Sequence, residues 1–442
     1  MVGRLACAGL SGAPGAHARR AAVCQCDADR ACPCRGRCVK LPPVLSAFTA
    51  TTALGVGNTP LLAALQTGTS GLKPCDFETA DIATWIGEVP GVDEVRLPPE
   101  LAAYDCRNHR LALLGLRADG FEQAARGAIA RYGADRVALI LGTSTSGILS
   151  AEAAYRERDA DGALPAWFDY RATHNTGALS SFVRDLLGLR GPAFTISTAC
   201  SSSAKAFAAA DRLMAAGLVD AAIVGGVDSL CLTTLYGFSS LELTSPEPCR
   251  PGDVNRQGLS IGEAAAYALL ERADAALPAA GARIVLAGWG ESSDAHHMSA
   301  PHPEGRGARA AMVQALDRAG LSAHDVDYIN LHGTATPAND LSEGAGVAAV
   351  FAGHPQVPAS STKGMTGHTL GAAGAVEAVI SALALQHGLL PASVGMQTPD
   401  PAIPIHIVSA PQRLPGMRNV LSNSFGFGGS NASLVLSRKE PA

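Results

Sequence analysis

The sequence predicts an α/β fold built from two duplicated halves, and two internal correspondences carry this prediction. From about Leu41 onward, short apolar strands alternate with Ala-rich helices, which is typical of a mainly parallel sheet covered by helices. Residues 123–147 and 312–336 share one plan: an amphipathic helix, a turn, a hydrophobic strand and a Gly-Thr-x-Thr loop. Residues 194–214 and 358–383 share a second plan: a strand, a turn of small residues and a helix. Because both plans recur in the same order, we expect two equivalent units packed back to back.

The limits of these units follow from changes in composition and in the pattern of apolar residues along the chain. We predict a first half over residues 41–282 and a second half over residues 283–438, preceded by a disordered or misassigned leader over residues 1–40. Six of the eleven cysteines lie in this leader. Their spacings do not match the Cys-x2-Cys pairs of zinc sites, so a leader is favoured over a metal site. The other five cysteines are scattered singles, which indicates reduced thiols.

The two halves differ by an insertion around residues 151–173, which is rich in charge and aromatic side chains. Its aromatic residues are Tyr155, Trp167, Phe168 and Tyr170. Such a segment can cap a pocket, form a dimer contact or make a plain surface excursion, and the residues leave these three alternatives open.

The composition favours a large protein with an extensive buried core. The chain has 442 residues, of which 47% are hydrophobic. Its net charge of -5 gives no indication of a nucleic-acid partner. No apolar run approaches the roughly 18 residues that cross a bilayer, so we expect no membrane insertion and a cytoplasmic location.

Cys200 is the first candidate functional residue. It follows the apolar strand 193–196 and precedes a helix over 203–216, so it lies in a tight turn with small neighbours. A thiol at a helix N-terminus feels free N–H groups and the helix dipole, and we expect both to lower its pKa and make it a nucleophile. The alternative is a small buried cysteine with no chemical role.

Two histidines occupy comparable positions in the second half. His332 ends the strand 326–331, at the carboxyl edge where sites of α/β folds gather. His368 precedes a helix over 372–386, where the dipole disfavours an imidazolium and favours a neutral, hydrogen-bonding ring. Either histidine can instead be a structural group whose hydrogen bonds are satisfied.

A glycine-rich segment lies near the C-terminus, between strands predicted at 419–422 and 432–436. Its small residues let the main chain bend and turn N–H groups toward a ligand, and Phe425 and Phe427 are candidate walls of an apolar cavity. The alternative is a plain glycine-rich hairpin. Neither this segment nor Gly371-Ala-Ala-Gly fits a nucleotide-binding pattern, so we expect no nucleotide cofactor.

Taken together, these segments resemble the β-ketoacyl-acyl-carrier-protein synthases of the elongating condensing-enzyme branch. The matching residues, in family order, are Thr198-Ala-Cys-Ser-Ser, His332-Gly-Thr-Ala-Thr-Pro-Ala-Asn-Asp, Ser361-Thr-Lys-Gly-Met-Thr-Gly-His-Thr-Leu-Gly-Ala-Ala-Gly and Asn423-Ser-Phe-Gly-Phe-Gly-Gly-Ser-Asn. The likeness covers about residues 44–437. It implies a thiolase-like fold, in which two duplicated halves form a five-layer α-β-α-β-α sandwich, usually as a homodimer.

The resemblance also implies a role for each matching residue. Cys200 would take an acyl chain from the phosphopantetheine arm of an acyl carrier protein, and no cofactor would be bound to the enzyme itself. His332 and His368 would then polarise the thioester carbonyl of a malonyl carrier protein as CO2 leaves. The backbone N–H groups of Cys200 and Phe427 would form the oxyanion hole, with Phe427 as a gate.

Further residues would support this chemistry. The resemblance carries over Lys363 as a supporting residue paired with Glu343. It also implies that Thr334 and Thr336 hydrogen-bond the phosphopantetheine arm.

Three rival classes of the superfamily are separated by single residues. Degradative thiolases need a second cysteine in the C-terminal glycine loop, yet no cysteine follows Cys249. Initiating synthases use Cys, His and Asn, whereas a histidine stands at 368. A non-catalytic chain-length-factor subunit lacks the nucleophile. It remains the alternative function, and a heterodimer with such a subunit is the alternative to a homodimer.

The chain also departs from the family pattern at several positions. It has Arg256-Gln-Gly-Leu and Gly262-Glu-Ala-Ala-Ala where Arg-Asp-Gly-Phe and Gly-Glu-Gly-Ala-Gly are common. After Cys200 it reads Ser-Ser-Ser-Ala-Lys, in place of the more usual Ala-Thr pattern. These changes leave the expected catalytic set intact, but they open a specialised polyene or polyketide-like pathway beside fatty-acid synthesis.

Overall fold

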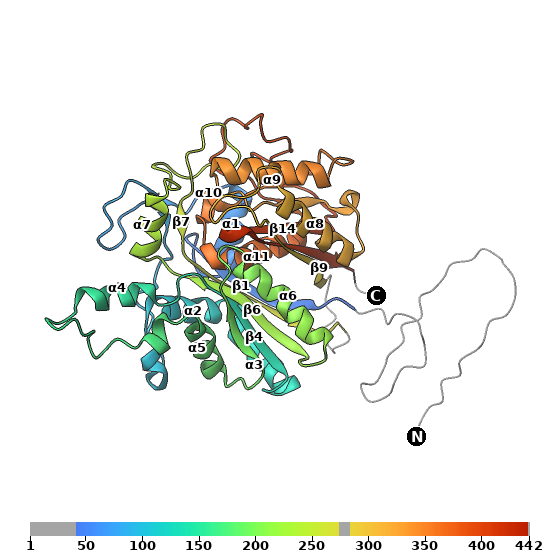
Figure 1. The fold of residues 1–442 in the computed structure, drawn as a ribbon. Coiled ribbons are helices and arrows are strands. Elements are labelled where there is room, and N and C mark those ends of the chain that lie inside the picture. Colours follow the sequence, from blue (N-terminus) through green and yellow to red (C-terminus); the bar gives the residue numbers. More distant parts are fainter. Residues whose placement is uncertain (1–40, 274–282, 441–442) are drawn as a thin grey trace, which may run out of the picture. The chain divides into compact units, whose positions relative to one another are not determined.

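The computed structural model describes residues 41–273 and 283–440 (Figure 1). The predictions made for residues 1–40, including the preference for a leader over a metal site, lie outside these ranges. The limit between the halves at residues 282 and 283 stays a prediction.

The first half forms five strands of a large sheet. They are β1 (Val44–Thr51), β4 (Val137–Gly142), β5 (Ala193–Ile196), β6 (Ala221–Asp228) and β8 (Ala264–Glu271). Their order across the sheet is β1-β8-β6-β4-β5. The second strand in the sequence pairs in parallel with the third and fourth, and the fifth runs antiparallel to the first and fourth.

The second half repeats this arrangement strand for strand. Its strands are β9 (Arg283–Ser293), β10 (Tyr328–Asn330), β11 (Ala359–Ser360), β14 (Asn419–Gly426) and β15 (Ser430–Lys439). Their order is β9-β15-β14-β10-β11, with the same parallel and antiparallel pairs in the same places. A single pair, Val44 with Val285, joins the two five-stranded parts. The predicted duplication is therefore confirmed.

Helices complete five layers. Two central helices, α6 (Ser202–Ala215) and α11 (Ala373–His387), each contact strands of both halves and so lie between the two parts of the sheet. Helices α2 (Arg107–Arg117), α3 (Phe121–Tyr132) and α5 (Gly177–Leu187) cover the outer face of the first half. Helices α8 (Arg306–Ala319) and α9 (Pro337–Val350) cover that of the second. This is the expected α-β-α-β-α sandwich, with one apolar cluster between the halves and one under each outer layer.

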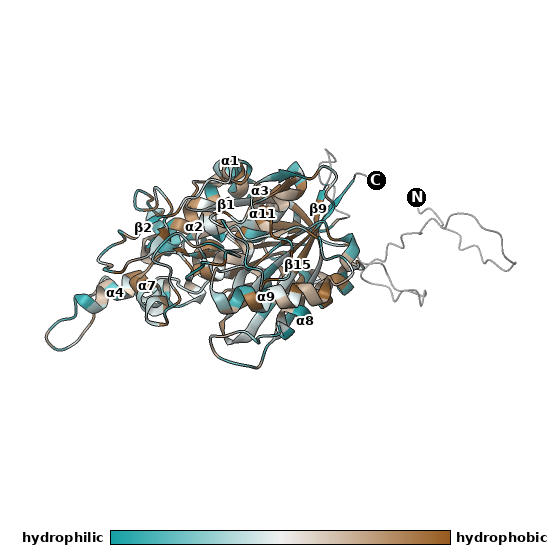
Figure 2. Cartoon of the chain, turned by 90° about the horizontal axis from the view of Figure 1, so that it is seen from above, coloured by the Kyte–Doolittle hydropathy of each residue, from teal (hydrophilic) through white to brown (hydrophobic). Residues whose placement is uncertain are grey.

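The central position of α11 explains its composition. All residues from Ala373 to Leu385 are buried, because the helix faces strands on both sides. The stretch Leu370–His387 has a mean hydropathy of 1.3 and the length of a bilayer-crossing helix, so the expectation that no apolar run approaches this length is wrong. Since 89% of this stretch is buried inside the protein, its hydropathy is that of a core helix. Figure 2 shows the hydrophobic colour concentrated in the inner strands and the hydrophilic colour on outer elements such as α8.

Shorter elements surround this frame. The remaining helices are α1 (Asn58–Thr67), α4 (Ile148–Arg156), α7 (Leu232–Ser240) and α10 (Lys363–Thr366), with a π-turn at Tyr170–His174. Short 3-10 helices are found at Pro99–Tyr104, Ala118–Gly120, Ala323–Asp325, Leu370–Ala372 and Phe427–Gly429. Two small sheets are formed by β2 (Lys73–Pro74), β3 (Trp85–Gly87) and β7 (Ile261–Gly262), and by β12 (Leu389–Leu390) and β13 (Gln412–Arg413).

The insertion at residues 151–173 lies at the surface. It contains the end of α4, and Tyr155, Trp167 and Tyr170 are each more than half exposed. The indole N–H of Trp167 donates to Glu157 within the same segment. None of this segment, all of which the structure describes, lines the cavity whose wall contains Cys200, and the three alternatives for the segment stay open.

The packing of β9 against α8 gives a stability prediction. A Cβ added at Gly290 would overlap the backbone carbonyl oxygen of Ala311, so Gly290→Ala forces the helix away from the strand. We expect a loss of about 3 kcal/mol in the free energy of unfolding, measured by urea denaturation. The matched control is Gly127→Ala on α3, where an added Cβ meets nothing within 4 Å. It should be neutral or stabilise the protein by about 0.5–1 kcal/mol, and equal effects of the two changes would contradict this packing argument.

Candidate active site

Cys200 lies in the tight turn between β5 and α6, as predicted. The turn forces Ala199 to a φ of 53°, and the hydroxyl of Ser202 accepts a hydrogen bond from the N–H of Thr198 at 2.9 Å. The second half packs closely against this turn, since a Cβ at Gly426 would lie 2.9 Å from the carbonyl oxygen of Thr198. The thiol is therefore buried, with 5% of the residue exposed.

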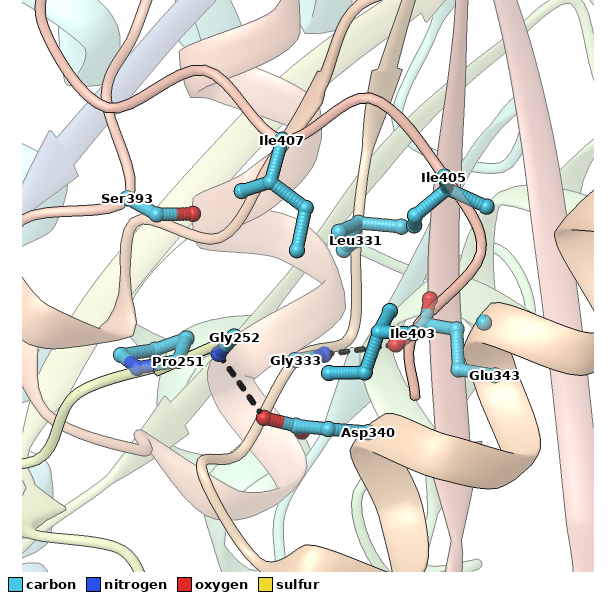
Figure 3. A pocket seen from close by; sticks show the side chains of 11 residues that line it. Pro251, Gly252, Leu331, Gly333, Asp340, Glu343, Ser393, Ile403, Ile405 and Ile407 are labelled. Carbon is cyan, nitrogen blue, oxygen red and sulfur yellow. Dashed lines mark hydrogen bonds between the residues drawn. The ribbon is translucent and has the colours of Figure 1, made fainter. Parts of the chain in front are cut away.

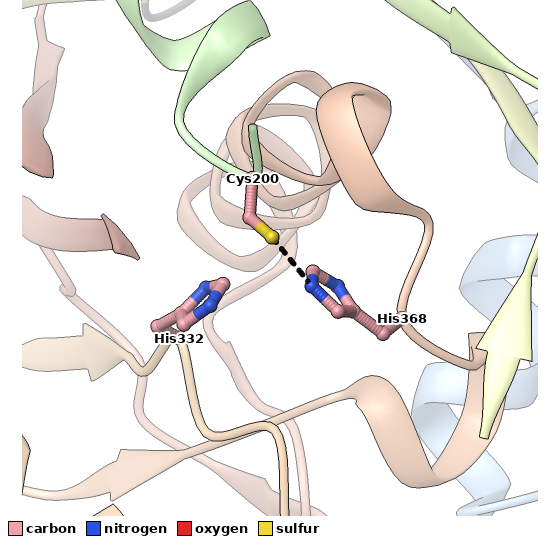
Figure 4. Close-up of side chains that lie close together, drawn as sticks. All are labelled: Cys200, His332 and His368. Atoms are coloured by element: carbon pink, nitrogen blue, oxygen red, sulfur yellow. Dashed lines mark hydrogen bonds between the residues drawn. The ribbon is translucent and has the colours of Figure 1, made fainter. Parts of the chain in front are cut away.

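The two predicted histidines meet Cys200 from the other half (Figure 4). His332 lies two residues after the end of β10 at Asn330. His368 follows α10 in the turn that corresponds to the turn of Cys200. Nε2 of His368 lies 2.9 Å from Sγ of Cys200. The rings of His332 and His368 are 5.2 Å apart, nearly perpendicular at 82°. The duplicated fold thus brings together three side chains that are distant in the sequence.

Lys363 is buried beside this group, and its partner differs from the predicted one. Its ammonium forms an ion pair with Glu377 of α11 and also donates to the carbonyl oxygen of His332. The expected pairing with Glu343 is wrong. Glu343 instead accepts the N–H groups of His332 at 2.8 Å and Gly333 at 2.7 Å, because α9 places it on the opposite side of this loop.

The same ammonium selects a tautomer for His332. Nζ of Lys363 lies 3.5 Å from Nδ1 of His332. An ammonium can only donate, so Nδ1 must be the acceptor and the ring proton is held on Nε2. His332 is thereby a hydrogen-bond donor through Nε2.

Burial determines the charge states of the site. It raises the pKa of the Cys200 thiol to about 12, although the Lys363 charge and the backbone N–H of Phe427 act in the opposite direction. The expectation of a lowered thiol pKa is therefore wrong, because desolvation outweighs the helix terminus. Burial, reinforced by the charge of Lys363, lowers the pKa of His332 and His368 well below 6.5. The resting site consists of a neutral thiol and two neutral imidazoles.

The glycine-rich segment is a hairpin and also a wall of the site. Strands β14 and β15 are longer than predicted and pair from Asn419 to Gly426, leaving a short turn at Phe427–Gly429. The ring of Phe425 lies 6.0 Å from that of His332, and the ring of Phe427 lies 5.5 Å from that of Phe238. Both alternatives drawn from the sequence therefore apply to one segment.

A cavity of about 600 Å³ leads to Cys200. Of the predicted residues, its wall contains Cys200, His332, His368, Thr334, Thr336, Phe425 and Phe427. The hydroxyl oxygens of Thr334 and Thr336 are 2.9 Å apart. Its wall also contains residues that sequence reasoning missed, among them Phe238, Asp294 and Asn339.

A second, smaller pocket is lined by Leu331 and Gly333, the residues on either side of His332 (Figure 3). Glu343 and Asp340 face it together with three isoleucines of the segment 403–407, and it shares no wall residue with the larger cavity. The N–H of Gly252 donates to Asp340 at 3.0 Å, which attaches the first half to this region.

One missed residue did have a signal in the sequence. Glu377 is the single acidic residue of α11, a helix of mostly apolar residues. An acidic side chain buried within a core helix requires a cationic partner, and Lys363 was the candidate nearest in sequence.

The ligand atoms of Cys200, His332 and His368 lie within 4.8 Å of one another, a spacing that can hold a metal ion. The charge of Lys363, 3.5 Å from His332, opposes a divalent cation at this position. The prediction of no metal stays a prediction.

The fold and this site define a class of thiolase-like proteins with a Cys-His-His centre. Two family models match the chain: the N-terminal domain of β-ketoacyl synthases over residues 115–276 and their C-terminal domain over residues 283–397. The chain is 37% identical over 304 residues to nodulation protein E of Rhizobium sp. (strain N33), a match covering 68% of this chain and 75% of that protein. The chain belongs to the β-ketoacyl synthase family.

Two further relatives add detail. The chain is 43% identical over 260 residues to 3-oxoacyl-[acyl-carrier-protein] synthase 2 of Rhizobium meliloti (strain 1021), which covers 57% of this chain. The matched region spans 62%, 57% and 63% of the length of the first three curated relatives. Among solved structures, a chain of the ketosynthase (ApeO) in complex with its chain length factor (ApeC) from Xenorhabdus doucetiae is similar, with a TM-score of 0.80 and 40% identity. That match covers 90% of this chain and 98% of that one.

The Lys363–Glu377 ion pair gives a prediction about stability. Glu377→Gln leaves the ammonium buried without its anionic partner, and we expect a loss of about 3–5 kcal/mol in the free energy of unfolding. The double change Lys363→Met with Glu377→Leu removes both charges, so its free energy of unfolding should fall less than that of Glu377→Gln. Urea denaturation of both variants measures the difference. If the double variant is as unstable as the single one, an unpaired charge is not the cause.

Glu343 gives a prediction about pH. Burial raises its pKa to about 7, above the ordinary 4.5, so the native state binds more protons than the unfolded chain between these values. The contribution of this group to stability is therefore full below pH 4.5 and is lost as the pH rises through 7, on the order of 3 kcal/mol in all. Glu343→Gln should flatten the profile of stability against pH in this window. Parallel profiles for the two proteins would contradict the shifted pKa.

Proposed function

We propose that this protein is a β-ketoacyl-acyl-carrier-protein synthase, an acyltransferase that condenses an acyl-Cys enzyme with a malonyl carrier protein. The products are a β-ketoacyl carrier protein, CO2 and a free carrier protein, in fatty-acid or related polyene or polyketide-like biosynthesis. The observation that carries the proposal is the contact of the Cys200 thiol with His368, beside a second histidine held as a donor, at the end of a cavity. The family supports it.

The first step loads the acyl chain on Cys200. Because the thiol is neutral at rest, its attack on the carrier thioester is coupled to loss of the proton, and Nε2 of His368 is placed at 2.9 Å to take it. The bond from the acyl carbon to the carrier sulfur breaks, and the proton passes to the leaving carrier thiol. Both imidazoles are neutral again when the acyl enzyme has formed.

The second step releases CO2 and forms the carbon–carbon bond. The bond between the malonyl carboxylate and its α-carbon breaks, and the electron pair moves to the thioester oxygen as an enolate. Nε2–H groups of His332 and His368 hold this oxygen in a site without bulk water, where such donors act strongly. The α-carbon then attacks the acyl-Cys carbonyl, whose oxygen is held by the N–H groups of Cys200 and Phe427. Collapse of this intermediate expels the Cys200 thiolate, which takes up one proton originating from solvent and so restores the thiol.

The partner for both steps would be an acyl carrier protein. Its phosphopantetheine arm would reach Cys200 through the 600 Å³ cavity, where Thr334 and Thr336 offer hydroxyl groups and Phe427 stands as the gate. Lys363 supports the site by fixing His332. No cofactor is needed for these steps, and we propose that they take place in the cytoplasm.

We further propose that the protein acts as a dimer of two thiolase-like chains. Strand β5 lies at the edge of the sheet with Phe194 39% exposed, and an edge strand of this kind is a surface for pairing with another chain. A homodimer is the simplest case. A heterodimer with a chain-length-factor subunit is the other, since two similar solved structures are described as a ketosynthase with its chain length factor. An intact Cys200 favours the catalytic partner over the non-catalytic one.

Cys200→Ser is the first test of this function. We expect the variant to fold normally and to lose self-acylation and condensation, because a hydroxyl is a far weaker nucleophile than a thiol in this site. Intact-mass analysis after incubation with acyl carrier proteins reads the loading directly and also identifies the acyl chains accepted. A folded Cys200→Ser variant that still condenses would refute the assignment.

His332→Ala tests which of the two steps, acylation of Cys200 or decarboxylation, depends on His332. Removal of one donor to the enolate should lower decarboxylation of malonyl carrier protein about 10²–10³-fold while Cys200 is still acylated. Release of CO2 and the mass of the acyl enzyme measure the two steps separately. Loss of acylation with normal decarboxylation would show that the roles are assigned wrongly.

A further inference from the structure

Lys205 is a half-buried cation on the helix that carries the nucleophile. It lies on α6, five residues after Cys200, in the Ser-Ser-Ser-Ala-Lys stretch that departs from the family pattern. Nζ donates to the hydroxyl oxygen of Ser430 at 2.6 Å. Burial lowers the pKa of Lys205, whereas Glu291 acts in the opposite direction. That carboxylate is itself in an ion pair with Arg212, whereas the hydroxyl of Ser430 is within hydrogen-bond distance of this ammonium.

Ser430 closes the turn that carries Phe427. It is the first residue of β15 and pairs with Gly426, the last residue of β14. The far side of the same turn is fixed by the segment after β9: the N–H of Gly428 donates to the carbonyl oxygen of Met298 at 2.7 Å, and Gly429 accepts from Asp294 at 2.9 Å. The turn is thus held on two sides. On one side it is bound by the segment after β9, and on the other by Lys205 of α6, the helix that follows Cys200.

The turn itself has little stiffness of its own. Gly428 and Gly429 adopt φ values of 74° and 71°, and Gly428 is exposed. Two adjacent glycines in the left-handed region can leave this conformation easily, so contacts from outside must keep the turn in place. The backbone N–H of Phe427, which faces the sulfur of Cys200, depends on that placement.

We propose that Lys205 is a positioning residue: through Ser430 it ties the Phe427 turn to helix α6 and so keeps the Phe427 N–H aligned with the reacting carbon on Cys200. The proposal rests on the proposed function for the role of that N–H. The link itself, from Lys205 of α6 through Ser430 to the Phe427 turn, does not rest on that function. A charge-assisted bond to a hydroxyl is stronger than a neutral one, which suits a turn that must be held against two flexible glycines.

Hydrogen–deuterium exchange tests the link without any substrate. Lys205→Met keeps the length of the side chain but removes the donor, and Ser430→Ala removes the acceptor. Each should speed exchange of the amides of residues 427–429 about tenfold, and the double variant should be no faster than either single one, since all three lack the same bond. The control is Lys439→Met at the exposed far end of β15, which should leave exchange of the turn unchanged. Unchanged exchange in Lys205→Met, or additive effects in the double variant, would overturn the proposal.

Kinetics then separate positioning from general damage. In Lys205→Met, kcat of condensation should fall about tenfold while KM for malonyl carrier protein stays the same, because the misplaced N–H acts on the transition state. Lys205→Arg keeps a cationic donor and should restore most of kcat. A kcat of Lys205→Arg no higher than that of Lys205→Met would contradict positioning by the donor. If Cys200→Ser refutes the condensation while the exchange result holds, the proposed function fails and the mechanical link remains.

Discussion

The N-terminal ends of the two central helices meet without room for a side chain between them. A Cβ at Gly374 of α11 would lie 2.6 Å from the backbone nitrogen of Ala204 of α6, and the N–H of Ala375 donates to the hydroxyl of Ser203 at 2.9 Å. Each helix follows the third strand of its own half, α6 after the turn with Cys200 and α11 after α10 and the turn with His368. Close approach of the helices therefore brings these turns together, one with the thiol and the other with the imidazole that touches it. The thiol and the imidazole can therefore meet only because the residues at the helix contact, such as Gly374 and Ala204, are small.

The same packing buries the site, and desolvation by burial is the largest cause of the pKa shifts of Cys200, His332 and His368. In water, a thiol at a helix terminus beside a lysine would have a lowered pKa, whereas here desolvation raises it to about 12. Lys363 is buried together with Glu377 in an ion pair. Burial lowers the pKa of both imidazoles well below 6.5, and the charge of Lys363 acts in the same direction. A site with one paired ion and otherwise neutral groups can deliver hydrogen-bond donors to a developing anion without reorganisation.

The sequence was sufficient for the plan of the fold and for the residues that meet at its centre. The repeated helix–strand–loop and strand–turn–helix units predict the two duplicated halves, whereas the order of strands across the sheet comes from the structure. Because Cys200 and His368 lie in corresponding turns of the two halves, the duplication also explains why they meet. The partner of Lys363 was not predictable in this way, because Glu343 and Glu377 are both acidic residues at plausible separations. The packing of α9 and α11 decides which of them faces the ammonium, and the isolated acidic residue of α11 is the one sequence signal for this outcome. The direction of the pKa shift of the Cys200 thiol was predicted wrongly for a related reason. The shift depends on burial, and burial depends on which residues of the second half cover the turn.

The two histidines are alike in type and burial, yet their second ring nitrogens have different surroundings. Nδ1 of His332 faces the ammonium of Lys363, which fixes the ring proton on Nε2. Within residues 41–273 and 283–440, Nδ1 of His368 has no hydrogen-bond partner, so nothing there fixes its tautomer. A ring with a fixed proton can only donate toward the substrate. A ring with a free second nitrogen can accept a proton from the adjacent thiol and later present it as a donor. The asymmetry of one lysine beside two similar imidazoles is therefore enough to make the proposed acylation step depend on His368, whereas the proposed decarboxylation step uses both histidines as donors.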